Sequence, residues 1–271
     1  MMRTTIFRSN RMAIAMVGAL VAPTAVIAQQ PAQASPSAIR MAAPTIRPGE
    51  VYAAPWVERA AGPANAGRIV GTGDVPSIPL TESERPLQSH ERVFVTVPPG
   101  MSSAAGARYV AVRRGPMLEG YGQVMIPTGI VVIQRAQPGQ AAEATVVTRF
   151  APMQIDDELV TMEGIPANLP RPTAVANGAT TRVLWIARDP VLPSLQSYVV
   201  VGNSAGLRVG DQITFYRERR TTTSGVVLPE SEIGVAQIVR STPQGATALV
   251  IDQTFGAIAQ GTAARVSAKM P

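Results

Sequence analysis

Side chains able to carry out chemistry are scarce in this sequence. His90 is its one histidine among 271 residues, and it contains no cysteine. Thiol catalysis, CxxC redox chemistry, iron–sulfur clusters and disulfides are therefore excluded. Zinc sites normally draw on Cys and His, so carboxylates would have to supply any metal ligands. His90 lies between Ser89 and Glu91, and without a nucleophile beside it we expect an exposed polar residue.

Two short motifs resemble functional signatures but lack the context that each one needs. Gly202–Gly206 (GNSAG) matches the G-x-S-x-G nucleophile elbow, which requires a strand-to-helix turn and a histidine downstream. A strand is expected to follow it here, and His90 lies upstream. Asp156–Glu158 is the densest acidic cluster but lacks the spacing of a calcium loop. We predict a simple turn at the first motif, a solvated turn at the second, and no catalytic, cofactor-binding or metal-binding residue.

Two arginine clusters are the best candidates for binding. Arg113 and Arg114 form the first, and Arg217, Arg219 and Arg220 form the second. Each cluster is expected to lie at the end of a strand, in the tip of the loop that follows. Arginine recognises carboxylates and phosphates in a bidentate manner, so these tips could contact an anionic glycan, lipid headgroups or an acidic protein. The alternative is a solubilising hairpin tip, because runs of charge usually form solvated surface.

The elements that would carry these clusters come from an internal repeat. Gly106–Arg113 matches Gly210–Arg217, and Ile130–Phe150 matches Val235–Phe255, roughly 105 residues later. Such ordered self-similarity predicts a duplicated module. Two further matches keep the same order: Pro86–Ser89 with Ser194–Ser197, and Gly122–Pro127 with Ser224–Pro229.

Each copy has the pattern of short strands. The segments are rich in β-branched residues and bounded by Gly or Pro, which favours small all-β barrels or sandwiches. We predict strands at Val93–Val97, Arg108–Val112, Ile130–Arg135 and Ala144–Arg149, matched by Tyr198–Val201, Gln212–Arg217, Val235–Arg240 and Thr247–Asp252, with leading strands at Gly67–Gly71 and Thr181–Arg188.

The amino-terminal part has the composition of a targeting segment and a linker. Arg3, Arg8 and Arg11 precede an uncharged apolar run that is too short to span a bilayer. Residues 29–66 hold six prolines and eleven alanines, which predicts a flexible leader with local docking at Tyr52, Trp56 and Val57. The predicted domains are a cleaved signal peptide at 1–28, a leader at 29–65, module 1 at 66–166, a linker at 167–179 and module 2 at 180–271.

Removal of the signal peptide changes the electrostatic balance. The whole chain carries 24 basic and 18 acidic residues, a net charge of +6. Without the three arginines of the signal peptide the balance is 21 against 18, or +3. This charge is too sparse for nucleic-acid binding. We expect a protein of the periplasm or cell envelope with no transmembrane segment after cleavage and no cofactor.

Part of module 2 resembles a known group of proteins. The resemblance rests on Gly206–Asp211 (GLRVGD), Gly225–Glu230 (GVVLPE), Val235–Arg240 (VAQIVR), the ending Ala268–Pro271 (AKMP) and the leader stretch Arg47–Trp56. These segments are similar to the carboxyl-terminal region of uncharacterised bacterial envelope proteins that begin with a LysM peptidoglycan-binding domain. Between the signal peptide and the leader we expect no room for a LysM fold, so no residue here inherits its glycan contacts.

Together these features predict a non-enzymatic binding or assembly scaffold associated with peptidoglycan. An alternative is a protein–protein assembly module of a flagellar or secretion-type envelope complex, because the VGD turn and the valine-rich strands resemble small barrels of such assembly factors. A glycan-processing enzyme is a further alternative, since two carboxylates can meet in space without paired spacing in the sequence.

Overall fold

The computed structural model describes residues 46–59, 63, 66–73, 85–162, 164, 171–187, 195–202, 206–254 and 258–271. This described part consists mainly of strands, so the prediction of an all-β protein is confirmed. The predicted signal peptide at 1–28 and the beginning of the predicted leader, 29–45, lie outside the described residues.

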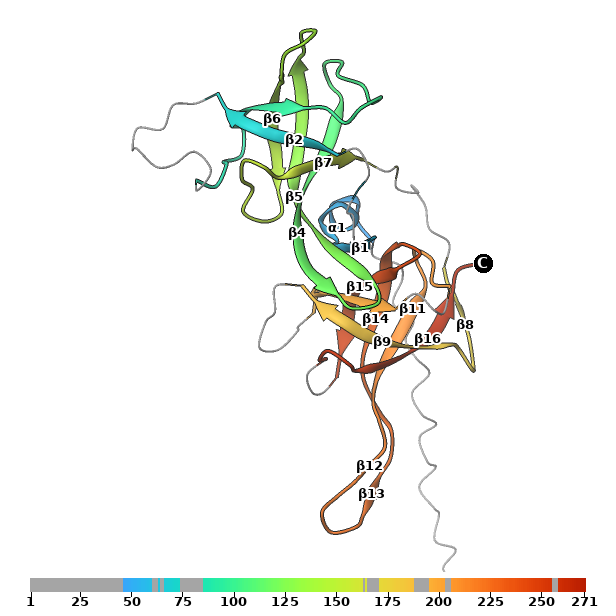
Figure 1. Ribbon diagram of the computed structural model, residues 1–271. Helices are drawn as coiled ribbons and strands as arrows, with labels where there is room; N and C mark the ends of the chain where they lie inside the picture. Colours follow the sequence, from blue (N-terminus) through green and yellow to red (C-terminus); the bar gives the residue numbers. More distant parts are fainter. Residues whose placement is uncertain are drawn as a thin grey trace, which may run out of the picture. The chain divides into compact units, whose positions relative to one another are not determined.

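Six strands of the first half form a closed antiparallel barrel, barrel 1 (Figure 1). Around the ring the strands follow the order β2-β3-β6-β5-β4-β7, and β7 pairs back with β2. In β3, Val93 and Val95 are buried and Phe94 is exposed, because successive strand side chains point to opposite faces. The strands are β2 (Gly67–Thr72), β3 (Arg92–Thr96), β4 (Arg108–Leu118), β5 (Gly122–Arg135), β6 (Ala142–Arg149) and β7 (Glu158–Thr161).

Six strands of the second half form barrel 2, which has its own apolar core around Ile213, Phe215 and Ile238. Its ring order is β9-β10-β15-β14-β11-β16, and β16 pairs back with β9. The ring strands are β9 (Thr180–Ile186), β10 (Tyr198–Gly202), β11 (Gln212–Arg217), β14 (Ser231–Ser241), β15 (Gly245–Gln253) and β16 (Ala263–Lys269). Three short strands are appended: β8 (Thr173–Ala174), which pairs with β16, and β12 (Arg220–Thr221) with β13 (Val227–Leu228).

The two barrels have the same connectivity. Strands β2 to β7 of barrel 1 correspond in order to β9, β10, β11, β14, β15 and β16 of barrel 2. Backbone hydrogen bonds repeat as well: the N–H of Gly106 donates to Ile133 and the N–H of Gly210 donates to Ile238, both at 2.8 Å. The pairs of strands that the repeat predicts therefore occupy matching places, while their origin by duplication stays a prediction.

Several boundaries differ from the sequence-based expectation. Strand β4 continues to Leu118, and β5 begins at Gly122, well before the predicted Ile130. The sequence patterns did not indicate β7 and β16, although these two strands close the rings. The predicted linker at 167–179 contains β8, which belongs to the sheet of barrel 2.

The end of the predicted leader is ordered. Residues 46–59 form a short helix, α1 (Pro48–Ala53), and a strand, β1 (Trp56–Glu58), so the prediction of a flexible leader is wrong for this segment. Pro48 suits the first turn of a helix, and the Glu50 carboxylate accepts the Arg47 N–H at 2.8 Å. The expected docking of Trp56 and Val57 is confirmed, since both are buried.

Segment 46–59 contacts both barrels. On one side, β1 pairs with β5 of barrel 1, with Trp56 opposite Met125. On the other side, hydroxyl groups of barrel 2 donate to carbonyl oxygens of the segment. These bonds run from Tyr198 to Glu50 at 2.8 Å, from Thr247 to Pro55 at 2.5 Å and from Thr242 to Val57 at 2.9 Å.

Candidate binding site

Arg113 and Arg114 lie inside a strand, so the prediction of a loop tip is wrong for this cluster. Strand β4 continues past both residues, and its pairing with β5 extends to Leu118. The Arg113 Nε donates to an Asp157 carboxylate oxygen at 3.2 Å, and the Arg114 Nη2 lies 2.8 Å from a Glu158 carboxylate oxygen. Both arginines are therefore held by carboxylates of their own barrel.

The acidic partners of these arginines are buried, which corrects the prediction of a solvated turn. Asp157 is only 4% exposed. One of its carboxylate oxygens accepts the Thr128 hydroxyl at 2.8 Å and the Gln154 N–H at 3.0 Å. Glu158 is also buried, whereas Asp156 is exposed as expected. The first arginine cluster is thus paired with buried carboxylates of barrel 1, while its own side chains stay partly exposed.

Arg217, Arg219 and Arg220 lie in a different setting. They belong to the arginine hairpin, residues Arg217–Glu230, which connects β11 to β14 and includes the β12–β13 pair. This hairpin extends beyond the barrel wall (Figure 1). All three residues are exposed. Among the described residues, none supplies a hydrogen bond or an ion pair to their guanidinium groups, so this cluster remains accessible to a ligand.

The two carboxylates of the arginine hairpin are already paired with arginines of the barrel wall. Glu218 lies 2.6 Å from Arg182 on β9, and Glu230 lies 3.2 Å from Arg265 on β16. These pairs leave the three hairpin arginines without a local acidic partner among the described residues. The hairpin therefore presents a positive potential to its surroundings.

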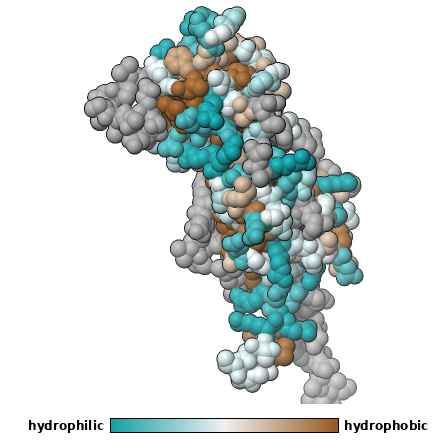
Figure 2. Space-filling model, viewed as in Figure 1, coloured by the Kyte–Doolittle hydropathy of each residue, from teal (hydrophilic) through white to brown (hydrophobic). Residues whose placement is uncertain are grey.

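The end of the arginine hairpin is apolar. Val226 and Val227 are 58% and 57% exposed, the two largest values among the exposed hydrophobic residues described. The turn is fixed by the Thr222 N–H, which donates to Val226 O at 2.8 Å, and by the Thr222 hydroxyl oxygen, which accepts the Val226 N–H at 3.0 Å. In Figure 2 hydrophilic side chains cover the base of the hairpin, and neutral and hydrophobic ones cover its end.

One carboxyl group beside the hairpin has a perturbed pKa. Glu232 lies two positions beyond the hairpin on β14, opposite Tyr216 of β11. Partial burial raises the pKa of Glu232, and the neighbouring Asp252 carboxylate raises it further. Glu232 therefore takes up a proton at a higher pH than an ordinary glutamate, and its protonation removes a negative charge from beside the hairpin.

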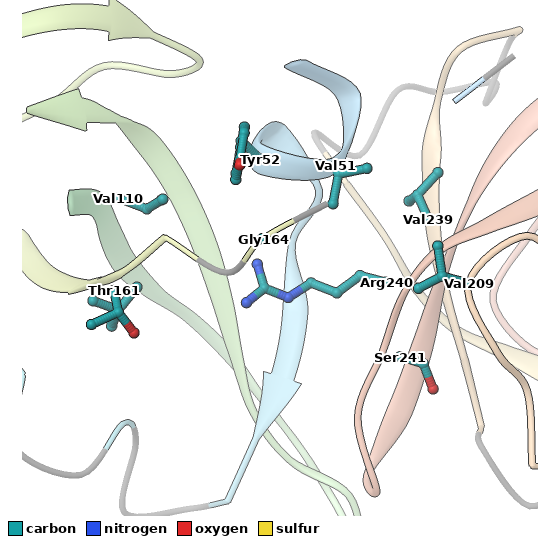
Figure 3. A pocket seen from close by; sticks show the side chains of 10 residues that line it. Val51, Tyr52, Val110, Thr161, Gly164, Val209, Val239, Arg240 and Ser241 are labelled. Atoms are coloured by element: carbon teal, nitrogen blue, oxygen red, sulfur yellow. The ribbon is translucent and has the colours of Figure 1, made fainter. Parts of the chain in front are cut away.

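Arg240 is a half-buried residue to which the sequence patterns assign no role; it lies in the repeat segment Val235–Phe255, at the position that matches Arg135. Its guanidinium carbon lies 3.6 Å from the centre of the Trp56 ring, a cation–π geometry. The side chain extends from β14 toward Thr161 and Gly164 (Figure 3). The adjoining cavity, walled mainly by valines, has about 100 Å³, well below the ~300 Å³ at which ligand pockets usually begin. We assign Arg240 to the packing of segment 46–59.

The other candidates from the sequence form no site in the part of the chain that the structure describes. His90 is exposed, and its backbone adopts a left-handed turn with φ 68° just before β3. Most of the GNSAG motif, residues 203–205, lies outside the described residues. Within the described ranges no three His, Asp or Glu side chains gather as metal ligands would. The arginine hairpin is therefore the most developed candidate site.

Comparisons with known proteins add no assignment. The chain matches no protein-family model and is significantly similar to no curated protein. Among the described residues, no helix has the length and apolar character required to cross a membrane.

Proposed function

We propose that this chain is a secreted, non-enzymatic scaffold of the cell envelope that holds peptidoglycan through the arginine hairpin. The observation that carries the proposal is the contrast between two arginine clusters at corresponding places of two equivalent barrels. Arg113 and Arg114 pair with carboxylates of barrel 1, whereas Arg217, Arg219 and Arg220 find no such partner among the described residues.

The chemistry of the arginines suits the peptide part of the wall. Peptidoglycan stem peptides carry free carboxylates, which the planar guanidinium group recognises with two parallel hydrogen bonds. Three arginines within four positions, at residues 217, 219 and 220, suit a polymer with repeated acidic groups. Each exposed contact is weak by itself, so several neighbouring contacts would add up to stable retention.

Sedimentation with isolated cell-wall sacculi tests the proposal. The wild-type protein should pellet with sacculi well above a control periplasmic protein. The variant Arg217→Gln/Arg219→Gln/Arg220→Gln should be retained about tenfold less, a loss of ~1.4 kcal/mol. The matched control is Arg68→Gln/Arg92→Gln/Arg135→Gln, which removes the same charge from exposed ion pairs of barrel 1. Equal retention of both triple variants would contradict the proposal.

A second candidate function is favoured by the apolar end of the hairpin. Val226 and Val227 are exposed side by side. Within the described ranges β12 and β13 pair only with each other, so their outer edges could accept a strand from another protein. This supports a protein–protein assembly module of an envelope complex. The variant Val226→Ser/Val227→Ser should then abolish co-purification of a specific envelope protein while leaving sedimentation with sacculi unchanged. Co-purification of the same partners by this variant and the wild type would rule out this candidate.

A further inference from the structure

We infer that a polar cavity at the base of the arginine hairpin binds a neutral sugar ring, which would give the proposed peptidoglycan scaffold a glycan subsite. The cavity has about 370 Å³, within the range of ~300–1,000 Å³ that is usual for small-molecule sites. Its walls come from barrel 2 and from the β4–β5 turn of barrel 1. The side chains that carry the argument are Tyr121, Arg182, Tyr216, Glu218, Glu230 and Arg265.

The charges of the cavity compensate one another. Arg182 pairs with Glu218 at 2.6 Å and Arg265 pairs with Glu230 at 3.2 Å. Two guanidinium groups and two carboxylates leave no net charge, which argues against an ion as the ligand. They do supply both donors and acceptors. A sugar hydroxyl donates and accepts at once, so it can bridge such a pair without breaking its charge balance.

Two aromatic rings complete the cavity. Tyr121 is 40% exposed, so part of its ring is available to the apolar C–H face of a sugar. It lies over Gly202: a β-carbon built on this glycine would lie 3.5 Å from the Tyr121 ring. The second ring, Tyr216, is covered by Arg265 at 4.8 Å, which orients the Arg265 guanidinium at the cavity wall.

The cavity is continuous with the hairpin. Glu218 lies between Arg217 and Arg219 in the sequence, and Glu230 ends the hairpin. A sugar bound between these glutamates would therefore direct an attached acidic peptide toward the hairpin arginines. A disaccharide-peptide unit carries these two chemistries together, a neutral ring followed by carboxylates.

Titration of the purified protein with N,N′-diacetylchitobiose, a neutral amino-sugar disaccharide, tests the cavity separately from the hairpin. We expect saturable binding by calorimetry, and at least about tenfold weaker binding by Tyr121→Leu. Phe94→Leu is the matched control, because Phe94 is an aromatic residue of similar exposure, 37%, on β3 of barrel 1. Unchanged thermal unfolding of Tyr121→Leu would show that the variant is folded.

The outcomes separate this inference from the proposed function. The triple arginine variant should bind the disaccharide like the wild type, because its substitutions lie outside the cavity walls. Absence of disaccharide binding, or equal binding by Tyr121→Leu and the wild type, would overturn the sugar site while leaving retention by the arginines intact. Loss of disaccharide binding in the triple arginine variant would also overturn it, since the ligand would then be held by the hairpin.

Discussion

Asp156 and Asp157 are neighbours in the sequence, yet their carboxylates are held in different ways. Asp156 is exposed and forms a 3.4 Å ion pair with Arg68, which is also exposed. Asp157 is buried and accepts hydrogen bonds from Arg113, Thr128 and Gln154. A buried acceptor that loses its donors costs far more than a surface ion pair. The contribution of each carboxylate to stability thus follows from its burial.

We predict that Asp157→Asn lowers the free energy of unfolding by about 2 kcal/mol, because its amide nitrogen must face one of these donors. Asp156→Asn should cost less than ~1 kcal/mol, since asparagine tolerates the left-handed φ of 73° at this position. Urea denaturation of both variants measures the difference. Equal midpoints would show that the Asp157 network does not stabilise barrel 1.

Glu91 should make stability depend on pH. Burial alone would raise the pKa of its carboxyl group, but hydrogen bonds from Arg85, the Gln88 N–H and the Thr72 hydroxyl, with the Arg85 charge, hold the pKa below its ordinary value. A lowered folded-state pKa stabilises the protein above the unfolded-state pKa, and this stabilisation is lost as the pH falls through the folded-state pKa.

The variant Glu91→Gln should therefore melt at a lower temperature than the wild type at pH 7. The gap should close as the pH falls below about 4.3, the ordinary value for glutamate. Thermal unfolding between pH 3 and 7 measures this convergence. A gap that stays constant across the whole range would mean that the charge of Glu91 contributes nothing.

At the scale of elements, the long strand β5 depends on a glycine where it packs under the β6–β7 connection. A β-carbon at Gly129 would lie 2.3 Å from Thr148 O and 2.4 Å from the Met153 terminal methyl group. Gly71 of β2 has nothing within 4 Å of the same position. We predict that Gly129→Ala lowers the free energy of unfolding by about 1–3 kcal/mol through overpacking. Gly71→Ala should leave the free energy of unfolding unchanged or raise it slightly. Equal unfolding free energies for both would contradict this packing.

The sequence predicted strands that are rich in β-branched residues, and it missed one that is very short and one that is rich in alanine. Strand β7 has four residues and begins with the ion-paired Glu158. Strand β16 buries Ala264, Val266 and Ala268, and alanine is a weak strand former. Both strands close their ring by pairing with a strand far away in the sequence, β7 with β2 and β16 with β9.

Prediction of the candidate site from the sequence is limited in the same way, by contacts between remote segments. The arginine clusters have similar sequences, and the prediction treated them alike. Arg113 and Arg114 meet acids 44 positions later in the chain, whereas the corresponding positions of barrel 2 carry Thr262 and Ala263. The sequence therefore contains the difference between the two clusters, because acids are present in one copy and absent at the matching positions of the other. Only the fold identifies these acids as the partners of the arginines.

At the scale of the whole molecule, Trp56 is central to the contact of segment 46–59 with both barrels. It is 4% exposed, opposite Met125 of barrel 1 and beneath Arg240 of barrel 2. We predict that Trp56→Ala lowers the free energy of unfolding by about 3–5 kcal/mol. It should also speed amide hydrogen exchange in both β5 and β15. The control Trp185→Ala, in β9, should change exchange in barrel 2 alone. If Trp56→Ala speeds amide exchange in barrel 1 alone, Trp56 does not form a contact shared by the two barrels.

Contact between the hairpin arginines and wall carboxylates can be measured by removing each group in turn and then both together. Wild-type protein and the Arg217→Gln/Arg219→Gln/Arg220→Gln variant are each titrated onto untreated sacculi and onto sacculi whose carboxylates have been amidated. If arginines and carboxylates contact one another, substitution of the arginines alone or amidation of the sacculi alone should weaken retention about tenfold. The two changes together should weaken retention no further than either one. If the two losses multiply, or if amidation leaves wild-type retention unchanged, the hairpin arginines do not hold the wall through its carboxylates.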